Sequence, residues 1–432
     1  MSNIYETVLV EQNRHWDGDG KLYSHAFERS HAVQALSRLH LQEIQVITGI
    51  RRVGKSTLLQ TMINHLIKTH HAKSILYINF DDPNYTTVWK DASQIYTIVT
   101  AAETITQQTV QYLFLDEVQN VEAWEKYVKS TYDSERFKKI VVTGSNANLL
   151  NSHYAKLLSG RYLKTHIYPI AYHELLKNSG ITTTHQLIKK KSLALKHVNT
   201  LLQYGGFPRI HCIDDPLERI DLLKNYYETI LLKDCIANHD IRDISTLMQL
   251  AHYLVSNPAA LYSYNSLSQA VASNENTVKQ FIQIFHNAYF FDEIRPFSYS
   301  LSKQLRANKK IYCIDNGLIS AAAFQFSDNF GKLFENLVYT ELQKANYADI
   351  YFFHDQNECD FIVGDAKNKI AIQVCYHLTL ENKPREIAGL VAAMKKFSIK
   401  KSVIITYNDE EKITDEIQAI PFWKYFYSNK TN

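Results

Sequence analysis

The chain of 432 residues is poor in glycine and proline, with 13 and 8 of them. Because these residues mark turns and loops, their scarcity predicts a helix-rich chain with few long loops. Net charge is also small, at +3 with histidine neutral. A chain so close to neutrality does not coat nucleic acid through bulk charge, so any nucleic-acid contact must come from a local patch.

Long apolar stretches are absent as well. No run of about 18 apolar residues occurs, and the N-terminal residues are polar, without the apolar core of a signal peptide. The cysteines stand far apart and form no C-x-x-C pair; they are Cys212, Cys235, Cys313, Cys359 and Cys375. A scattered, odd set is typical of reduced thiols. We therefore expect a cytoplasmic protein with no membrane segment.

Hydrophobic residues make up 45% of the chain, which is enough for well-packed cores, and its length predicts several domains. In the first third, short apolar runs alternate with helical patterns. The predicted strands are EIQVITG, KSILYINFDD, QYLFLDEV and KKIVVTGSN. This alternation predicts a parallel sheet covered by helices on both faces. From YLKTHIYPIAYHELL to about residue 255 the pattern is mainly helical.

The first predicted strand runs into GIRRVGKST, residues 49–57, which has the spacing G-x-x-x-x-G-K-[ST]. The glycines let the backbone wrap around phosphate oxygens, Lys55 reaches the β- and γ-phosphates, and the Ser56 hydroxyl ligates Mg²⁺. The predicted ATP-binding residues are Gly49, Arg51, Arg52, Val53, Gly54, Lys55, Ser56 and Thr57. The sequence contains no N-K-x-D guanine-reading pattern, so ATP is the expected nucleotide.

The third predicted strand ends in two carboxylates, Asp116 and Glu117. Parallel sheets bind ligands at the carboxyl ends of their strands. Asp116 is therefore predicted to hold Mg²⁺ through its water shell, and Glu117 to polarise the attacking water as a general base. The alternative is that both carboxylates only terminate a strand.

The fourth predicted strand ends at Ser145 and Asn146. A polar side chain between the phosphate loop and the Asp-Glu strand can hold the attacking water or the γ-phosphate. Ser145 is the first choice for this sensor and Asn146 the second. Alternatively, the two residues cap a helix at ANLL, residues 147–150.

The runs GIRRVGKSTLL, FLDEVQN, VVTGSNANLL, LSGRYLKTHIYPIAYHELL and YGGFPR resemble AAA+-like ATPases of bacteria and archaea. In these, a P-loop domain is followed by a C-terminal domain of unassigned function. YYETILLKDCIANHDIRD, IYCIDNGL and GKLFENLVYTEL are similar to that C-terminal domain, so the resemblance spans nearly the whole chain. It also implies that Arg161 or Arg209 completes the ATP site and stabilises charge on the transferring phosphoryl group. A structural ion pair is an equally good interpretation of either arginine.

The resemblance implies an AAA+/STAND-type core, a winged-helix-like middle and a restriction-endonuclease-like C-terminal fold. The predicted fold class is therefore α/β: a P-loop parallel sheet, then a helical and winged-helix region, then a second α/β domain. The predicted domains are 1–170 for the P-loop ATPase, 171–255 for a helical lid or connector, 256–325 for the winged-helix-like domain and 326–432 for the restriction-endonuclease-like domain.

In the middle region, NTVKQFIQIFHNAYFF has the spacing of a half-buried helix. Its predicted buried face is Val278, Phe281, Ile282 and Phe285. Lys279 and Gln283 are predicted to lie exposed, as on the recognition helix of a winged helix-turn-helix. Because only one of these two is basic, DNA and a protein partner remain nearly equal alternatives.

The C-terminal stretch FFHDQNECDFIVGDAKNKIAIQVCYHL is a hairpin pattern with Glu358 and Asp360 on its first arm. In restriction-like nucleases, such an Asp pairs with Glu-x-Lys on the next strand to hold Mg²⁺ and activate water. The resemblance places that element at Gln373 and Cys375, which lack both charges, and Glu335 on the preceding helix does not restore the site alone. We expect a nuclease fold without nuclease activity, used to bind nucleic acid or protein.

These patterns predict a Mg²⁺-dependent ATPase that couples hydrolysis of ATP to ADP and phosphate to DNA binding, remodelling or translocation. The alternative is a nucleotide-controlled protein-interaction switch with slow ATP turnover. Both use Lys55, Ser56 and Asp116, and they differ in whether DNA accelerates turnover. The expected partners are ATP, DNA or a protein, and further copies of the chain in a ring or dimer.

Overall fold

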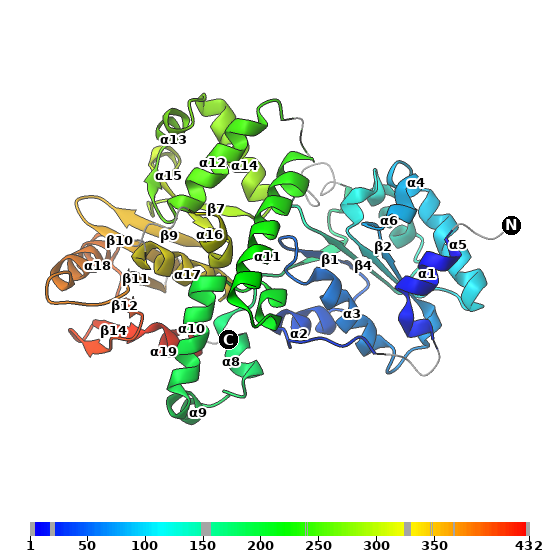
Figure 1. Cartoon of the computed structure of the whole chain (residues 1–432), viewed down its shortest axis with the longest axis horizontal. Coiled ribbons are helices and arrows are strands. Elements are labelled where there is room, and N and C mark those ends of the chain that lie inside the picture. The colour runs from blue at the N-terminus through cyan, green and yellow to red at the C-terminus, as the bar shows by residue number, and fades with distance from the viewer. Residues whose placement is uncertain are drawn as a thin grey trace. The chain divides into compact units, whose positions relative to one another are not determined.

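The computed structural model describes residues 5–17, 22–147, 157–237, 239, 241–323, 330–345, 347, 349–365 and 368–428. The chain divides into two compact units, whose elements are labelled in Figure 1. The first comprises the chain up to Tyr168 together with Asn287–Tyr289. The second comprises Pro169–His286 and the chain from Phe290 onwards.

The first unit is built on a five-stranded, all-parallel sheet with the strand order β2-β3-β4-β1-β5. Its strands are β1 (Ile44–Thr48), β2 (Ile75–Asn79), β3 (Tyr112–Asp116), β4 (Lys139–Gly144) and β5 (Tyr162–His166). The first four confirm the predicted parallel sheet. The fifth was wrongly predicted to belong to a helical stretch. Its YLKTH sequence is only partly buried at the sheet edge, and it lacks the apolar run by which the others were recognised.

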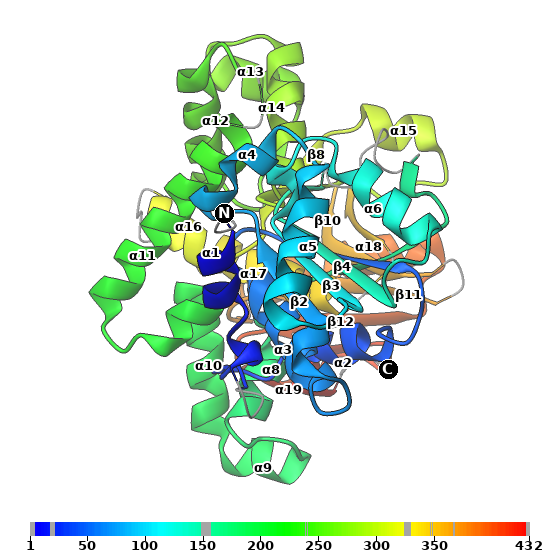
Figure 2. The same ribbon diagram turned by 90° about the vertical axis from the view of Figure 1, so that its right-hand side faces the viewer.

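Helices connect these strands and cover the sheet. They are α1 (Glu6–Gln12), α2 (Ser30–Ser37), α3 (Lys55–Leu66), α4 (Thr86–Trp89), α5 (Gln94–Thr106) and α6 (Trp124–Asp133). The connection from β1 to β2 crosses the sheet in one direction, and the next two connections return. Right-handed crossovers therefore put α3 on one face and α5 and α6 on the other, an arrangement seen again in Figure 2.

The second unit starts with helices. They are α8 (Tyr172–Asn178), α9 (Thr184–Lys189), α10 (Lys191–Tyr204), α11 (Pro216–Thr229) and α12 (Ile244–Ser256). A π-helical turn at Ile230–Ile236 follows α11 directly. Asp215 caps α11 by accepting from the N–H groups of Leu217 and Glu218, with Pro216 at the first helical position. This part confirms the predicted helical region.

A three-stranded antiparallel sheet, ordered β6-β8-β7, follows α12. Its elements are β6 (Leu261–Tyr262), α13 (Tyr264–Ala270), α14 (Glu275–Asn287), β7 (Phe291–Ile294), α15 (Leu301–Arg306), β8 (Lys309–Cys313) and α16 (Asn316–Ala322). The predicted inner residues of α14 are all buried, and Lys279 and Gln283 are exposed as predicted. The sequence did not indicate α15, which lies in the connection between the two hairpin strands.

The C-terminal part is a mixed sheet ordered β13-β14-β12-β11-β10-β9 with helices packed on it. Its elements are α17 (Phe330–Lys344), β9 (Ile350–His354), β10 (Glu358–Gly364), β11 (Lys369–Cys375), α18 (Lys383–Phe397), β12 (Lys401–Thr406), β13 (Glu411–Lys412), β14 (Ile417–Pro421) and α19 (Phe422–Ser428). β9, β10 and β11 form an antiparallel meander, whereas β11, β12 and β14 are parallel. The predicted hairpin is β10–β11.

None of the helices in the described ranges is both long and apolar enough to cross a membrane. The five cysteines are all free thiols, and only Cys212 is exposed.

Candidate functional site

The turn between β1 and α3 has a backbone that side chains would obstruct. Gly54 has φ 104°, and the neighbouring Arg52 is also left-handed at φ 68°. A Cβ on Gly49 would lie 2.5 Å from the carbonyl oxygen of Ile167. Glycine is therefore required at both ends of the loop, because only a residue without Cβ fits these positions without strain.

Lys55 is the first residue of α3 and is 4% exposed. Its Nζ donates to the carbonyl oxygens of Gly49 (3.2 Å) and Ile50 (3.4 Å), so the side chain folds back over the loop. The same Nζ lies 3.2 Å from Oε1 of Glu117. A buried ammonium beside the N-terminus of a helix is an anion-binding arrangement.

Asp116, the last residue of β3, is fully buried. Tyr77 Oη donates to its Oδ2 at 2.7 Å, Thr143 Oγ1 donates to its Oδ1, and Ser56 also hydrogen-bonds to it. Burial, followed by the charge of Glu117, raises the pKa of Asp116, while these three hydroxyls lower it. The structure thus brings together Ser56 and Asp116, the two residues predicted to serve Mg²⁺.

Glu117 has a left-handed backbone with φ 51° and donates its N–H to Thr143 Oγ1 at 3.0 Å. Such strain in a residue other than glycine is typical of functional sites. Burial favours the neutral acid, but Lys55, Gln119 and Arg51 outweigh it and lower the pKa of Glu117. Glu117 is therefore a charged carboxylate held at the ligand edge of the sheet.

The two sensor candidates follow β4, which lies between β3 and β1 in the sheet. Ser145 and Asn146 are both buried. Gln119 joins the first candidate to the base, since its Nε2 donates to Glu117 Oε2 at 2.6 Å and lies 3.4 Å from Ser145 Oγ. Most of the helix that the two residues were alternatively expected to cap, residues 148–150, lies outside the described part.

Sequence reasoning missed three side chains of this site, namely Tyr77, Thr143 and Gln119. Gln119 stood within the run FLDEVQN, two residues after the predicted base, and Thr143 stood two residues before the predicted sensor. Both were visible as polar residues next to predicted site residues. Tyr77 comes from β2, and its approach to Asp116 depends on strand pairing that the sequence does not specify.

Among the remaining predicted residues, Val53 is buried and the others are more exposed. Arg52 and Thr57 are exposed, and Arg51 is half-buried. Arg161, just before β5, pairs through Nε with Oδ1 of Asp133 at 2.8 Å, which agrees with the ion-pair alternative for this arginine. Arg209 is exposed in a 3₁₀ turn of the second unit, Pro208–Cys212, and its role remains a prediction.

Mg²⁺ fits this edge only together with a nucleotide. Within the described residues, no group of three or more His, Cys, Asp or Glu side chains is arranged to hold a metal ion. Mg²⁺ commonly binds through one or two protein ligands plus substrate phosphates and water. Ser56 would be a direct ligand and Asp116 would hold the ion through its water shell, and the ion would neutralise phosphate charge.

In the second unit, three of the predicted nuclease-like residues surround a lysine that the sequence did not single out. Lys310, on β8, places Nζ 2.8 Å from Glu335 on α17, 2.5 Å from Glu358 and 3.3 Å from Asp360, both on β10. Cys375 supplies no cation, as expected from its place in the sequence, but Lys310 brings one to the cluster from another strand. Burial opposes the charge on Lys310, but the three carboxylates outweigh it and raise its pKa.

The two residues expected to replace Glu-x-Lys take no part in the ion pairs of Lys310, although Gln373 Oε1 lies 3.4 Å from the backbone nitrogen of Asp360. Gln373 donates through Nε2 to Glu386 Oε2 at 2.7 Å. Cys375 donates through Sγ to the carbonyl oxygen of His377 at 3.0 Å. Burial and then the charge of Glu335 raise the pKa of Asp360, and the charge of Lys310 acts against the rise.

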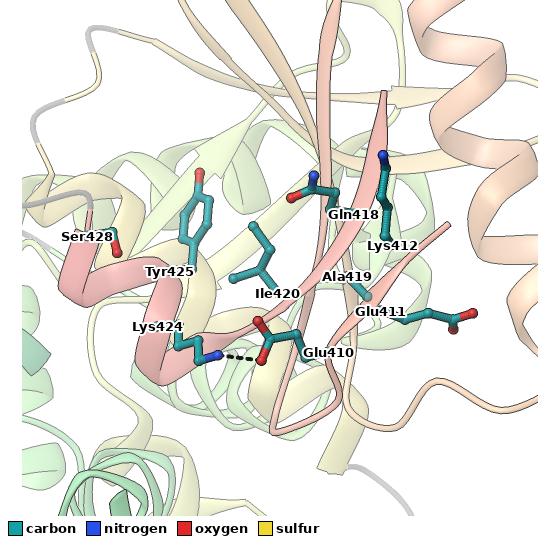
Figure 3. A pocket seen from close by; sticks show the side chains of 9 residues that line it. All are labelled: Glu410, Glu411, Lys412, Gln418, Ala419, Ile420, Lys424, Tyr425 and Ser428. Carbon is teal, nitrogen blue, oxygen red and sulfur yellow. Dashed lines mark hydrogen bonds and ion pairs between the residues drawn. The ribbon is translucent and has the colours of Figure 1, made fainter. Parts of the chain in front are cut away.

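A pocket of about 450 Å³ lies beside β13, β14 and α19 (Figure 3). Glu410 and Lys424, two of the residues that line it, form an ion pair. Its lining contains none of the predicted site residues. We assign it no role.

Comparison with known proteins divides the chain into three matched segments. Residues 41–176 match the model of an AAA domain, and residues 195–350 and 330–425 match two domains of unknown function, DUF8612 and DUF4143. An uncharacterized protein of Methanocaldococcus jannaschii is 33% identical over 403 residues, covering 89% of this chain and 88% of that one. Another from Haemophilus influenzae is 30% identical over 341 residues, covering 78% and 83%.

Solved structures are more distant. The Aeropyrum pernix ORC1 protein in complex with DNA aligns with 72% of this chain and 94% of that chain, at 10% identity and a TM-score of 0.33. At this score the likeness adds nothing to the fold described from the strands themselves.

Proposed function

The chain belongs to this family of proteins with an AAA domain, the AAA+ P-loop ATPases, and on that premise we propose that it is a Mg²⁺-dependent ATPase. It converts ATP to ADP and phosphate and couples this reaction to DNA binding, remodelling or translocation. The observation that carries the proposal is the contact between Lys55 and Glu117, 3.2 Å apart at the phosphate loop.

In that contact, Glu117 can be replaced by a phosphate group as the partner of Lys55. ATP brings phosphate oxygens that compete with Glu117 for Lys55, and charge-assisted hydrogen bonds to phosphate are strong and specific. Binding then releases Oε1 of Glu117 at the place where a water can approach the γ-phosphate. The same side chain thus reports on nucleotide binding and becomes a general base once Lys55 turns to phosphate.

The remaining groups support the charge and the water. Ser56 and Asp116 hold Mg²⁺, which neutralises the charge that develops on the phosphates. Ser145 holds the attacking water or the γ-phosphate, with Asn146 as the second choice. Arg161 or Arg209 completes the site in the nucleotide-bound assembly, where copies of the chain associate as a dimer or ring.

DNA is the partner we propose for α14 and the connection between β7 and β8. The order helix, turn, helix and hairpin suits a winged helix with α14 as its recognition helix. Exposed Lys279 and Gln283 lie on α14, and exposed Lys303 and Arg306 lie on α15. Lys279, Lys303 and Arg306 are thus exposed cations on a nearly neutral chain, and we propose that they supply the local basic patch that DNA phosphates require.

The test is ATPase rate with no DNA and with single-stranded, double-stranded and branched DNA. We expect at least one DNA form to raise the rate, and we expect Lys303→Gln with Arg306→Gln to reduce the ratio of stimulated to unstimulated rate. Lys55→Ala serves as the inactive control. Turnover that is unaffected by every DNA form would remove the DNA coupling and leave the ATPase.

The alternative is a nucleotide-controlled protein-interaction switch with slow turnover. It is favoured by the state of Glu117, both of whose oxygens are engaged, one by Lys55 and one by Gln119. Two measurements together distinguish the ATPase from the switch: the DNA-stimulation assay, and the native mass of the protein with and without ATP. Slow, DNA-independent turnover with ATP-dependent capture of a protein partner would favour the switch.

A further inference from the structure

Four charged side chains of the second unit converge from three separate elements. β8 contributes Lys310, α17 contributes Glu335, and β10 contributes Glu358 and Asp360. The Lys310 side chain is 3% exposed, whereas Glu335 and Asp360 are 14% and 9% exposed and Glu358 is 40% exposed. Each carboxylate directs an oxygen to within 3.3 Å of the same nitrogen atom.

Three oxygens around one point are how proteins hold a small cation, and here that point is Nζ of Lys310. In a restriction-like nuclease the corresponding cation would be Mg²⁺, held by the Asp of the first hairpin arm and the Glu of the second. The side chains of this chain do not fit that ion. Gln373 uses Nε2 for Glu386, and its Oε1 lies 3.4 Å from the backbone nitrogen of Asp360.

Lys310 cannot easily leave this position. It lies in the central strand of the three-stranded sheet, with Leu261 opposite on β6 and Ile294 opposite on β7. The segment that follows β7 is joined to β9 as well, because the carbonyl oxygen of Phe352, on β9, accepts from the backbone N–H of Phe297 at 2.7 Å. Strand pairing therefore fixes the backbone of Lys310, and moving its ammonium away from the three carboxylates would leave a buried charge without a partner, which is costly.

The carboxylates are also satisfied without a metal. Tyr312 Oη donates to Glu335 Oε1 at 2.7 Å, and the N–H of Val374 donates to Asp360 Oδ2 at 2.9 Å. A divalent ion entering the cluster would have to displace these donors and approach Nζ, a like charge, at close range. Both changes oppose binding.

We infer that Lys310 is the resident cation of the C-terminal domain: its ammonium stands where Mg²⁺ would bind, and the domain takes no divalent metal. Glu335, Glu358 and Asp360 then serve to join β8 to α17 and β10. Metal-dependent cutting of DNA by this domain is excluded for the same reason, since a nuclease needs the ion to activate water.

The test is Mn²⁺ binding to the nucleotide-free full-length protein, read from the spectroscopic signal of free Mn²⁺. We expect wild type and Asp360→Asn to give the same binding curve, because the cluster holds no metal. Lys310→Met should gain one Mn²⁺ per chain, and Lys310→Met with Asp360→Asn should lose it again. Lys310→Arg, which keeps the charge, should remain without that extra site.

Two outcomes would overturn the inference. The first is Mn²⁺ bound by the wild type and lost in Asp360→Asn, a comparison that needs no Lys310 variant and decides the question even if Lys310→Met fails to fold. The second is a folded Lys310→Met protein that gains no metal. Plasmid cleavage by wild type with Mg²⁺ or Mn²⁺, lost in Asp360→Ala and kept in Lys55→Ala, would likewise show a working metal site.

Discussion

Lys55 in the first unit and Lys310 in the second are both buried beside carboxylates, but they differ in the number of their charged partners. Lys55 contacts one carboxylate, Glu117, and two backbone carbonyls at the start of a helix. Lys310 contacts three carboxylates from two elements and sits within a sheet. The partner of Lys55 can therefore be replaced by a ligand, whereas the three partners of Lys310 hold it in place permanently.

The two sites differ in whether an incoming ligand can replace the carboxylate partners of the lysine. At Lys55, an incoming phosphate replaces a single carboxylate, and the helix N-terminus favours the new anion. At Lys310, a ligand would have to replace three acids at once. A lysine among carboxylates therefore indicates a ligand site only when its partners can be exchanged, and the predictions below separate the two cases.

The largest expected effect is on stability, for Lys310→Met. Removing one partner of a buried ionic cluster leaves uncompensated charge, and we expect a loss of about 3–5 kcal/mol in the free energy of unfolding. Lys55→Met, the matched control, should lose much less, because its one carboxylate keeps Gln119 as a partner. Urea unfolding of the full-length protein, followed by circular dichroism, measures both. Equal losses of unfolding free energy in the two variants would contradict the proposed difference between Lys55 and Lys310.

Lys55→Ala should then show the largest effect on activity. Without the ammonium the phosphates lose their main cation, and kcat/KM for ATP should fall roughly 10²- to 10³-fold. The measurement is phosphate release under ATP titration with Mg²⁺. Lys310→Arg, made in parallel, should keep the wild-type rate, and near-normal turnover by Lys55→Ala would remove the proposed ATP site.

Glu117→Gln should separate binding from chemistry. The amide keeps the shape of the side chain but cannot accept a proton, so turnover should fall roughly 10²-fold while ATP binding persists. Equilibrium binding of ATP and the rate of phosphate release are both needed. A variant that hydrolyses ATP at the wild-type rate would show that another group is the base.

Gln119→Met should have the smallest effect. Glu117 loses the donor that holds its second oxygen, and Gln119 no longer reaches Ser145, so kcat should fall about tenfold with KM unchanged, about 1.4 kcal/mol. A change confined to KM would mean that Gln119 contacts substrate instead of positioning the base. Equal fluorescence-detected melting of variant and wild type is the control for folding.

The phosphate loop, Asp116 and Glu117 were predictable because each lies in one short run next to a strand. Because each of these residues directly follows a strand, its place in the sequence also gives its place at the carboxyl edge of the sheet. Tyr77 and Lys310 were not predictable, because they reach the carboxylates across a strand pairing or from another sheet. Nothing in the local sequence of Lys309-Lys310 separates a buried lysine from the solvated pair that such residues usually form.

The fold was predictable to a similar degree. The first four strands were found because they are continuous apolar runs, whereas β5 was missed as a partly buried edge strand containing Lys164 and His166. The inner face of α14 was found from its helical spacing. That helix begins at Glu275, one residue before the run from which it was predicted, and such small differences are common at helix ends.

The position of Lys310 also limits where this chain can be divided into fragments and where its gene can recombine. The sequence suggests a cut between residues 325 and 326, which would leave Lys310 on one fragment and its three carboxylates on the other. A fragment that begins there would carry a buried cluster of like charges, so we expect it to be poorly soluble when produced alone. For the same reason, recombination that exchanged only the coding region for residues 326–432 would separate Lys310 from its three carboxylates, so β8 has to be exchanged together with the sheet that follows it.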